Sequence, residues 1–236
     1  IHVEGGQAPA DESNLALRAA RLLASRGGAR EGVHIDLRKR IPSGAGLGGG
    51  SSDAAATLRT LNALWALNAS LEDLCALGAQ LGSDVNFFLY GGAALCSGRG
   101  EVVHPLGVYN PTKYLLCVPQ LHVSTRDIYA RLRMPLTTPT RRSTNIIEAM
   151  TREDWPAVGR EIFNRLEEPA YAAYPHLAAV RQAMASEDSW GPMLSGSGCA
   201  LFLMAMPEKA DGLAVGLEDR VSSGVFLTAS PLRAGG

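Results

Sequence analysis

The hydrophobic positions along this chain repeat with two periods, one typical of helices and one typical of strands. Over residues 12–26 the apolar side chains recur every three or four positions until Gly27 and Gly28, which predicts a helix that ends there. Over residues 33–37 apolar and polar side chains alternate, which predicts a half-buried strand. Pro42 ends this strand, because proline cannot donate to a strand ladder.

The rest of the chain mixes the two patterns without an internal repeat. Ser70 begins a predicted helix over residues 70–82 with a capping box in which Asp73 replaces the usual Glu. Residues 83–86 are predicted as a loop, residues 97–100 as a turn, and residues 109–111 as the domain junction. The other predicted helices are 53–67, one starting near 124, 144–150, 156–167, 175–186 and 207–221, and the predicted strands are 87–96, 114–118, 199–205 and 225–229. The chain is therefore of the α/β or α+β class.

Composition narrows the classes of function. The chain has 236 residues, 46% of them hydrophobic, which suits one large or two modest globular domains. Its 22 Lys and Arg against 23 Asp and Glu give a formal net charge of −1. There is no basic excess to attract a phosphate backbone, so we expect no nucleic-acid partner.

No apolar run is long enough for a bilayer, since the longest, residues 199–206, is far short of the roughly 20 residues needed. The four cysteines form no C-x-x-C pair, and none lies near a histidine at metal-ligand spacing. We therefore expect a cytoplasmic protein with no membrane partner and no metal-ligating residues.

The glycines carry the clearest chemical signal. Five of the 26 lie between Pro42 and Ser52, after a predicted strand and before a predicted helix. Glycine allows close approach of a ligand to the backbone, and a helix N-terminus adds free N–H groups that favour anions. Ser51 and Ser52 add hydroxyls for phosphate or Mg²⁺. A polyphosphate site is predicted, and a flexible glycine linker is the less favoured alternative.

Three other phosphate motifs fit poorly. A Walker loop ends in Gly-Lys-Ser/Thr, and no lysine follows these glycines before Lys113. Gly44-x-Gly46-x-x-Gly49 matches the dinucleotide fingerprint in letters, but the acidic residues some 20 positions on open a helix instead of ending a strand. The His-Arg-Asp and Asp-Phe-Gly strings of protein kinases are absent from the sequence.

A fourth pattern matches better. Pro42, the glycines, Ser51 and Ser52 resemble the signature of the GHMP kinase superfamily. The string Gly-Leu-Gly-Gly-Gly-Ser-Ser-Asp-Ala-Ala at residues 46–55 is similar to that of the kinases acting on 4-diphosphocytidyl-2-C-methyl-D-erythritol. Further resembling segments follow in the family's order, from about residue 13 to the C-terminus: residues 81–88, 91–93, 98–101, 123–129, 164–167 and 194–198.

The resemblance implies an α+β, two-domain fold. Residues 1–109 would form an ATP-binding domain like domain 2 of ribosomal protein S5, and residues 110–236 a ferredoxin-like, substrate-binding domain. The implied reaction moves a phosphoryl group from ATP, with Mg²⁺, to the 2-hydroxyl of 4-diphosphocytidyl-2-C-methyl-D-erythritol in non-mevalonate isoprenoid precursor biosynthesis. The enzyme would be a monomer or homodimer. A homoserine- or mevalonate-type GHMP kinase and an inactive nucleotide-binding fragment are the alternatives.

The resemblance also implies site residues. Asp84 would accept or orient the proton of the hydroxyl, and its place after a helix C-terminus, unfavourable for a carboxylate, favours a local task. The implied ATP-binding residues are Asn14, Lys39, Pro42, Gly44, Gly46, Leu47, Gly48, Gly49, Gly50, Ser51 and Ser52. The implied substrate-binding residues are Thr125, Tyr129, Ser195, Gly196, Ser197 and Gly198. The alternatives are a plain loop aspartate for Asp84, an exposed cation for Lys39, a core or rim side chain for Tyr129 and a plain turn for residues 195–198.

The chain departs from the family pattern in three places. Position 86 is Asn where the family usually has Pro, and position 165 is Arg where it usually has Asp. The opening Pro-Ala-Lys-x-Asn string of the family and the Gly-Tyr-His string that follows it are absent from the sequence. We therefore expect this chain to lack the first structural units of the kinase, with a lysine that assists catalysis and a histidine that holds cytosine.

Overall fold

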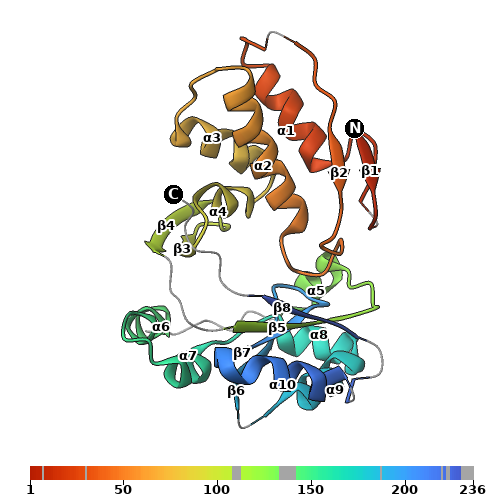
Figure 1. Ribbon diagram of the computed structural model, residues 1–236, viewed down its shortest axis with the longest axis vertical. Coiled ribbons are helices and arrows are strands. Elements are labelled where there is room, and N and C mark those ends of the chain that lie inside the picture. The colour runs from red at the N-terminus through yellow and green to blue at the C-terminus, as the bar shows by residue number, and fades with distance from the viewer. Residues whose placement is uncertain are drawn as a thin grey trace. The chain divides into compact units, whose positions relative to one another are not determined.

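The computed structural model describes residues 1–6, 8–29, 31–107, 113–132, 142–186, 188–218, 220–221 and 224–229. The chain forms two compact units (Figure 1). The first comprises Ile1–Ser43 and Gly48–Gly107, and the second comprises Gly44–Leu47 and Val108–Gly236. Residues 109–111, where the sequence predicts the domain junction, lie outside the described residues.

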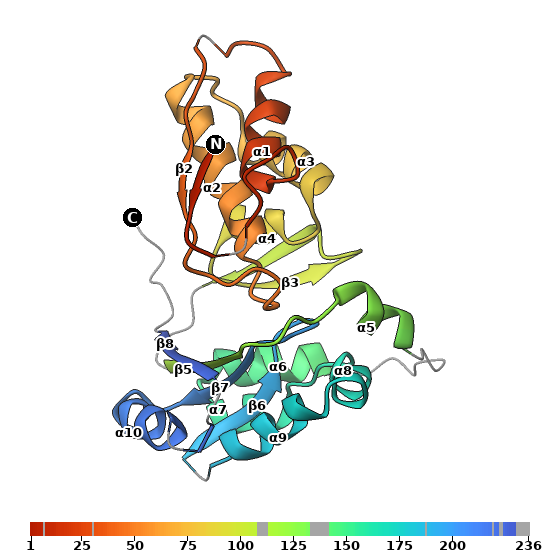
Figure 2. The same cartoon turned by 90° about the vertical axis from the view of Figure 1, so that its right-hand side faces the viewer.

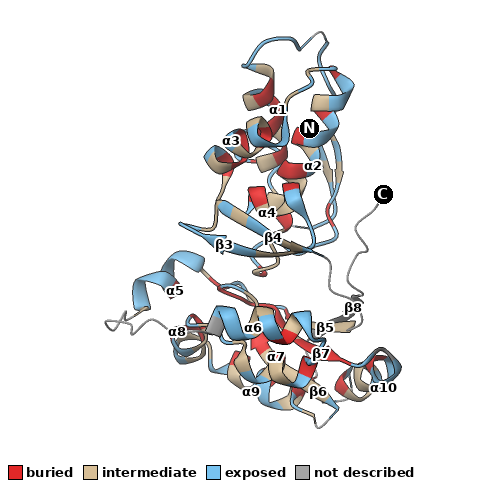
Figure 3. Ribbon diagram, turned by 90° about the vertical axis from the view of Figure 1, so that its left-hand side faces the viewer, coloured by how far each residue is buried: buried red, intermediate tan, exposed pale blue. Residues whose placement is uncertain are grey.

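The first unit is built mainly from helices. They are α1 (Leu15–Ala24), α2 (Gly49–Leu64), α3 (Leu71–Leu81) and α4 (Val85–Tyr90). A parallel pair, β1 (His2–Glu4) and β2 (Asp36–Arg38), and an antiparallel hairpin, β3 (Ala93–Ser97) and β4 (Val102–Gly107), complete it. The core is a layer of alanines and leucines that α1, α2 and α3 bury between them, coloured red in Figure 3. Small side chains such as Ala19 and Ala54 allow α1 and α2 to pack closely.

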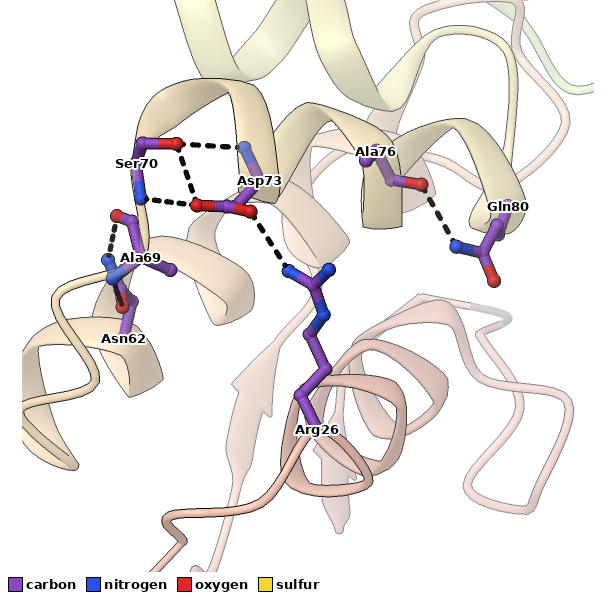
Figure 4. A network of polar contacts seen from close by, with 7 residues as sticks. All are labelled: Arg26, Asn62, Ala69, Ser70, Asp73, Ala76 and Gln80. Carbon is purple, nitrogen blue, oxygen red and sulfur yellow. Dashed lines mark hydrogen bonds and ion pairs between the residues drawn. The ribbon is translucent and has the colours of Figure 1, made fainter.

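Helix α3 begins where the sequence predicts it. The Ser70 side chain accepts a hydrogen bond from the Asp73 N–H, and the Asp73 carboxylate accepts one from the Ser70 N–H, so the predicted capping box is confirmed. Figure 4 shows this pair and the Arg26 guanidinium, which lies 3.3 Å from Asp73. The ion pair joins the end of α1 to the start of α3.

The region after α3 differs from the prediction. Residues 87–90, predicted as strand after a loop at residues 83–86, belong to helix α4, and the strand begins only at Ala93. Aromatic and β-branched residues favour strands in general, but here Val85, Asn86 and Leu89 are buried with helical spacing against α2 and α3. Tertiary packing therefore overrides the local preference.

The second unit is a four-stranded antiparallel sheet with the order β6-β7-β5-β8. Its strands are β5 (Lys113–Pro119), β6 (Ser189–Leu194), β7 (Leu201–Ala205) and β8 (Gly224–Ala229). Helices α5 (Thr125–Arg131), α6 (Arg142–Thr151), α7 (Trp155–Glu161), α8 (Glu167–Ala173) and α9 (Pro175–Met184) connect β5 to β6, and α10 (Pro207–Glu218) connects β7 to β8. This strand order is the expected ferredoxin-like arrangement.

The core of the second unit lies against the sheet. Figure 2 shows α9 and α10 along one face, and Leu177, Leu203 and Leu217 are fully buried there. The predicted helix 156–167 is in fact two helices, α7 and α8, separated by residues 162–166. Strand β6 was not predicted, because a bulge between Trp190 and Met193 breaks its alternation. Among the described residues, none of the helices combines the length and the apolar composition that spanning a bilayer requires.

Candidate active site

Residues 44–52, named here the glycine segment, lead into the N-terminus of α2. Gly48 is the N-cap residue and has φ 64°, a left-handed conformation that favours glycine. A Cβ there would lie 2.7 Å from the ring of Phe88. No side chain caps α2, and its first turn holds no acidic residue. The first N–H groups of the helix are therefore available to an anion.

The two serines of the segment differ in their hydrogen bonds. The Ser52 hydroxyl donates to the Gly49 carbonyl at 2.8 Å, one turn back in the same helix. The Ser51 hydroxyl makes no hydrogen bond with the residues that the structure describes. Of the two, Ser51 is therefore the side chain with its hydroxyl free for a ligand.

Lys39 lies directly after β2 and is buried, with 7% of its surface exposed. Its ammonium group forms an ion pair with the carboxylate of Asp53 on α2. The ammonium nitrogen lies 3.0 Å from the position that a Cβ at Gly49 would occupy, so Lys39 packs against the start of the helix. The alternative of an exposed cation is wrong, whereas a role of Lys39 in binding adenine stays a prediction.

Asn14 is the N-cap residue of α1 and is 4% exposed. Its side-chain oxygen accepts a hydrogen bond from the Ala16 N–H at 2.9 Å, and its amide nitrogen donates to the Pro9 carbonyl at 2.6 Å. This amide therefore fixes the start of a helix, and its predicted place beside ATP is untested.

Asp84 is exposed and lies immediately before α4. Its side chain does not cap the helix, and it accepts no hydrogen bond from the described residues. Asp84 follows the C-terminus of α3, as the sequence predicts, but it also precedes α4, whose N-terminus favours a carboxylate, so its position is not unfavourable. Partial burial of its thiol and, after that, the negative charge of Asp84 raise the pKa of Cys96 on β3.

The first part of the glycine segment packs within the second unit. Ala45 is 2% exposed and belongs to the core of that unit, and its carbonyl accepts the Ala200 N–H at 3.0 Å. The Ser195 hydroxyl donates to the Gly46 carbonyl at 2.8 Å. Gly46 has φ 76°, and a Cβ there would overlap the Ser195 carbonyl oxygen. Only glycine fits this position.

Residues 195–198, named here the serine turn, form a closed loop between β6 and β7. The Ser195 N–H donates to the Ala200 carbonyl at 2.8 Å, and the Gly198 N–H donates to the Ser195 carbonyl at 2.9 Å. The hydroxyls of Ser197 and Thr125 lie 2.8 Å apart, so the fold brings two predicted substrate residues together.

The remaining predicted residues are placed on exposed or half-buried backbone. Tyr129 lies on α5 with 58% of its surface exposed, so it is not a core residue and its ring is open to solvent. Pro42 and Gly44 are exposed before α2, and Gly50 is half-buried in its first turn. Leu47 packs against the core of the second unit.

Two residues of the site region were given no role from the sequence. The side-chain amide of Asn164 donates to the carbonyls of Leu194 and Gly196, at 2.9 and 2.6 Å. The Glu167 carboxylate accepts the Leu194 N–H at 2.9 Å. Both belong to the segment 164–167 that resembles the family pattern, and this resemblance was the sequence feature from which a role could have been predicted.

A hollow of about 1040 Å³ lies in the second unit, and Asn164 and Glu167 are among the residues that line it. Its described lining includes Arg131, Arg165, Glu168 and Arg181 from α5, α8, α9 and the segment before α8. None of the predicted substrate residues lines it. Among the residues with described placement, no group of three His, Cys, Asp or Glu side chains could hold a metal ion.

Comparison with known proteins gives two family matches. Residues 14–92 match the GHMP kinases N terminal domain, and residues 146–221 match GHMP kinases C terminal. The 4-diphosphocytidyl-2-C-methyl-D-erythritol kinase of Shouchella clausii (strain KSM-K16) is 43% identical over 202 residues, which cover 86% of this chain and 68% of that protein. The enzyme of the same name from Exiguobacterium sibiricum is 40% identical over 209 residues, covering 88% and 72%.

Solved structures agree with these matches. A crystal structure of 4-(cytidine 5'-diphospho)-2C-methyl-D-erythritol kinase superposes with a TM-score of 0.79 at 38% identity, over 96% of this chain and 80% of that one. A homoserine kinase from Cytophaga hutchinsonii has a TM-score of 0.81 at 21% identity, over 98% and 81%, and supports the fold alone. The chain belongs to the GHMP kinases and, within them, to the family of the 4-diphosphocytidyl-2-C-methyl-D-erythritol kinases.

Proposed function

We propose that this chain carries the ATP-dependent phosphorylation of the 2-hydroxyl of 4-diphosphocytidyl-2-C-methyl-D-erythritol, a step of non-mevalonate isoprenoid precursor biosynthesis. The observation that supports it most is the glycine segment, which leads into an uncapped helix in a chain 43% identical to a kinase of that name. A bound polyphosphate would accept hydrogen bonds from N–H groups that have no partner in α2 itself.

The residues present fit ATP and its metal ion. The start of α2 has free N–H groups, no acidic side chain in its first turn and, at Ser51, a free hydroxyl. Mg²⁺ bound with ATP would neutralise charge on the β- and γ-phosphates. Lys39 and Asn14, both buried and bonded within the first unit, would shape the nucleotide pocket and not move during the reaction.

Phosphoryl transfer depends mainly on positioning and on stabilising charge. The 2-hydroxyl oxygen bonds to the γ-phosphorus, the bond from that phosphorus to the bridging oxygen breaks, and ADP leaves. Asp84 would accept or orient the proton of the hydroxyl, for which its exposed and unbonded carboxylate is suited.

The second unit would bind the cytidine substrate. The exposed ring of Tyr129 offers a face on which cytosine can stack. Thr125 and the serine turn offer hydroxyl and backbone groups close to one another. These side chains lie on ordered elements of one unit, which suits a specific site.

A comparison of three acceptors, each supplied alone, tests the proposed function. The protein is incubated with Mg-ATP and, separately, with 4-diphosphocytidyl-2-C-methyl-D-erythritol, homoserine and mevalonate, and ADP is measured. We expect ADP above background only with the first. ADP with homoserine or mevalonate alone would indicate a different GHMP kinase. Binding of an ATP analogue without ADP from any acceptor would indicate an inactive nucleotide-binding protein.

A further inference from the structure

The backbone of Leu194, the last residue before the serine turn, is bound from two sides by side chains. Asn164 donates to its carbonyl at 2.9 Å, and Glu167 accepts its N–H at 2.9 Å. Asn164 also donates to the Gly196 carbonyl at 2.6 Å, and its own oxygen accepts the Leu166 N–H at 2.9 Å. Both N–H donors of the Asn164 side-chain amide, and one acceptor site of its oxygen, therefore form hydrogen bonds with backbone groups.

Glu167 is itself held in place by its neighbours. The Tyr171 hydroxyl donates to its carboxylate at 2.6 Å, and the Arg181 guanidinium lies 3.7 Å from the same oxygen. Burial and the hydrogen bond to Glu167 raise the pKa of Tyr171, so the phenol stays a donor through the physiological range. The acceptor for the Leu194 N–H is therefore fixed by α8 and α9.

The hydrogen bonds continue from the serine turn to the glycine segment. The Ser195 hydroxyl donates to the Gly46 carbonyl at 2.8 Å, and the Ala200 N–H donates to the Ala45 carbonyl at 3.0 Å. Because a Cβ at Gly46 would overlap the Ser195 carbonyl, the two backbones have little freedom to shift past each other. Movement of the turn therefore moves Gly46.

We propose that Asn164 and Glu167 are positioning residues for ATP binding: they hold the serine turn, which through Ser195 orients the backbone of the glycine segment around Gly46. The proposal rests on the proposed function of the glycine segment. The direction of the peptide at Gly46 decides where the neighbouring N–H groups point, and phosphate affinity depends on that direction. This gives a role to the segment 164–167, which the sequence alone left without one.

Replacement of Asn164 by aspartate is the main test. The variant keeps the shape of the side chain but places a carboxylate oxygen against two carbonyl oxygens, so the turn must shift. We expect the dissociation constant of a non-hydrolysable ATP analogue, measured by titration calorimetry, to rise at least tenfold. Asn62→Asp is the matched control, because Asn62 similarly binds both the N–H and the carbonyl of Ala69, in the first unit, as Figure 4 shows. We expect it to lower stability and leave ATP affinity within twofold.

Two variants of Glu167 test the same proposal if the Asn164→Asp protein does not fold. Glu167→Gln retains an oxygen for the Leu194 N–H and the Tyr171 hydroxyl, whereas Glu167→Ala removes it. We expect near-normal ATP affinity in the first and at least a fivefold loss in the second. Equal affinity in the two variants would overturn the proposal, as would an Asn164→Asp protein that binds the analogue normally.

Failure of this inference differs from failure of the proposed function. If Gly46→Ala leaves ATP affinity unchanged, the glycine segment does not bind the phosphates and the function itself is wrong. If Gly46→Ala and Ser195→Ala weaken binding while Asn164→Asp and Glu167→Ala do not, only the positioning role is wrong. Non-additive losses in Ser195→Ala combined with Asn164→Asp would support action through the turn.

Discussion

The packing of Gly46 against the serine turn predicts a difference between two alanine variants of the glycine segment. Gly44 and Gly46 have nearly the same φ, 71° and 76°, in the left-handed region. An alanine in this left-handed region costs about 1–2 kcal/mol at either position. A Cβ at Gly44 meets nothing within 4 Å, whereas one at Gly46 overlaps the Ser195 carbonyl oxygen and lies 3.1 Å from the Gly198 nitrogen.

The steric conflict adds to the backbone cost at one position only. Overpacking of a tight site typically costs about 1–3 kcal/mol, and here the obstacle is backbone that cannot rotate away. Gly46→Ala should therefore destabilise the second unit by about 2–5 kcal/mol and Gly44→Ala by about 1–2 kcal/mol. The difference corresponds to about a 5- to 150-fold change in the opening equilibrium of the turn.

Hydrogen exchange at the Ala200 amide measures that equilibrium, because this N–H donates to the Ala45 carbonyl inside the affected contact. We expect much faster exchange in Gly46→Ala than in Gly44→Ala, together with a larger loss of resistance to urea. If both variants change exchange and urea resistance to the same extent, the backbone contact described for Gly46 does not constrain the segment.

Three further predictions concern the first unit and the thiols. Lys39→Met should destabilise the first unit by about 3 kcal/mol, because it leaves the mostly buried Asp53 without its partner. Adding Asp53→Leu should recover most of the lost stability, measured by urea unfolding. A double variant no more stable than Lys39→Met would contradict this. Asp84→Asn should abolish ADP formation and keep ATP-analogue affinity, so normal turnover would remove its catalytic role. Iodoacetamide at pH 8 should label exposed Cys96 well before Cys117, because burial raises the pKa of Cys117 to about 11, and peptide mass spectrometry checks the order of labelling. The stability that the protonated Cys117 contributes should be present below about pH 9 and lost as the pH rises to about 11. Unfolding measured across this pH range, with Cys117→Ala as the control, checks that loss.

Features that depend on near neighbours in the sequence were predictable. The capping box at Ser70 involves residues three apart, and the glycine segment is a continuous string between a strand and a helix. The order of strands in the second unit followed from the family resemblance and not from periodicity. Short elements were harder to predict, because α4 and β6 owe their conformation to the elements they pack against. The local preference favoured a strand where α4 lies and indicated no element where β6 lies.

Features that join distant parts of the chain were not predictable. Asn164 is 30 and 32 residues from the two carbonyls it binds, and Ser195 is 149 residues from Gly46. No local pattern encodes such partners. Burial of Lys39 was also invisible, because a lysine beside two arginines is typical of a solvated surface, and its partner Asp53 lies 14 residues away on another element.

The ion pair between Lys39 and Asp53 has a consequence for how the first unit would attract phosphate. The carboxylate neutralises the buried ammonium group of Lys39 beside the start of α2, so Lys39 adds little net charge there. Attraction then comes from backbone dipoles, which act at hydrogen-bond range, and not from a free lysine of the Walker type. Hydrogen bonds at contact distance are screened less by added salt than long-range attraction between free charges is, so nucleotide affinity should fall less steeply with ionic strength than it would with a free lysine at this place.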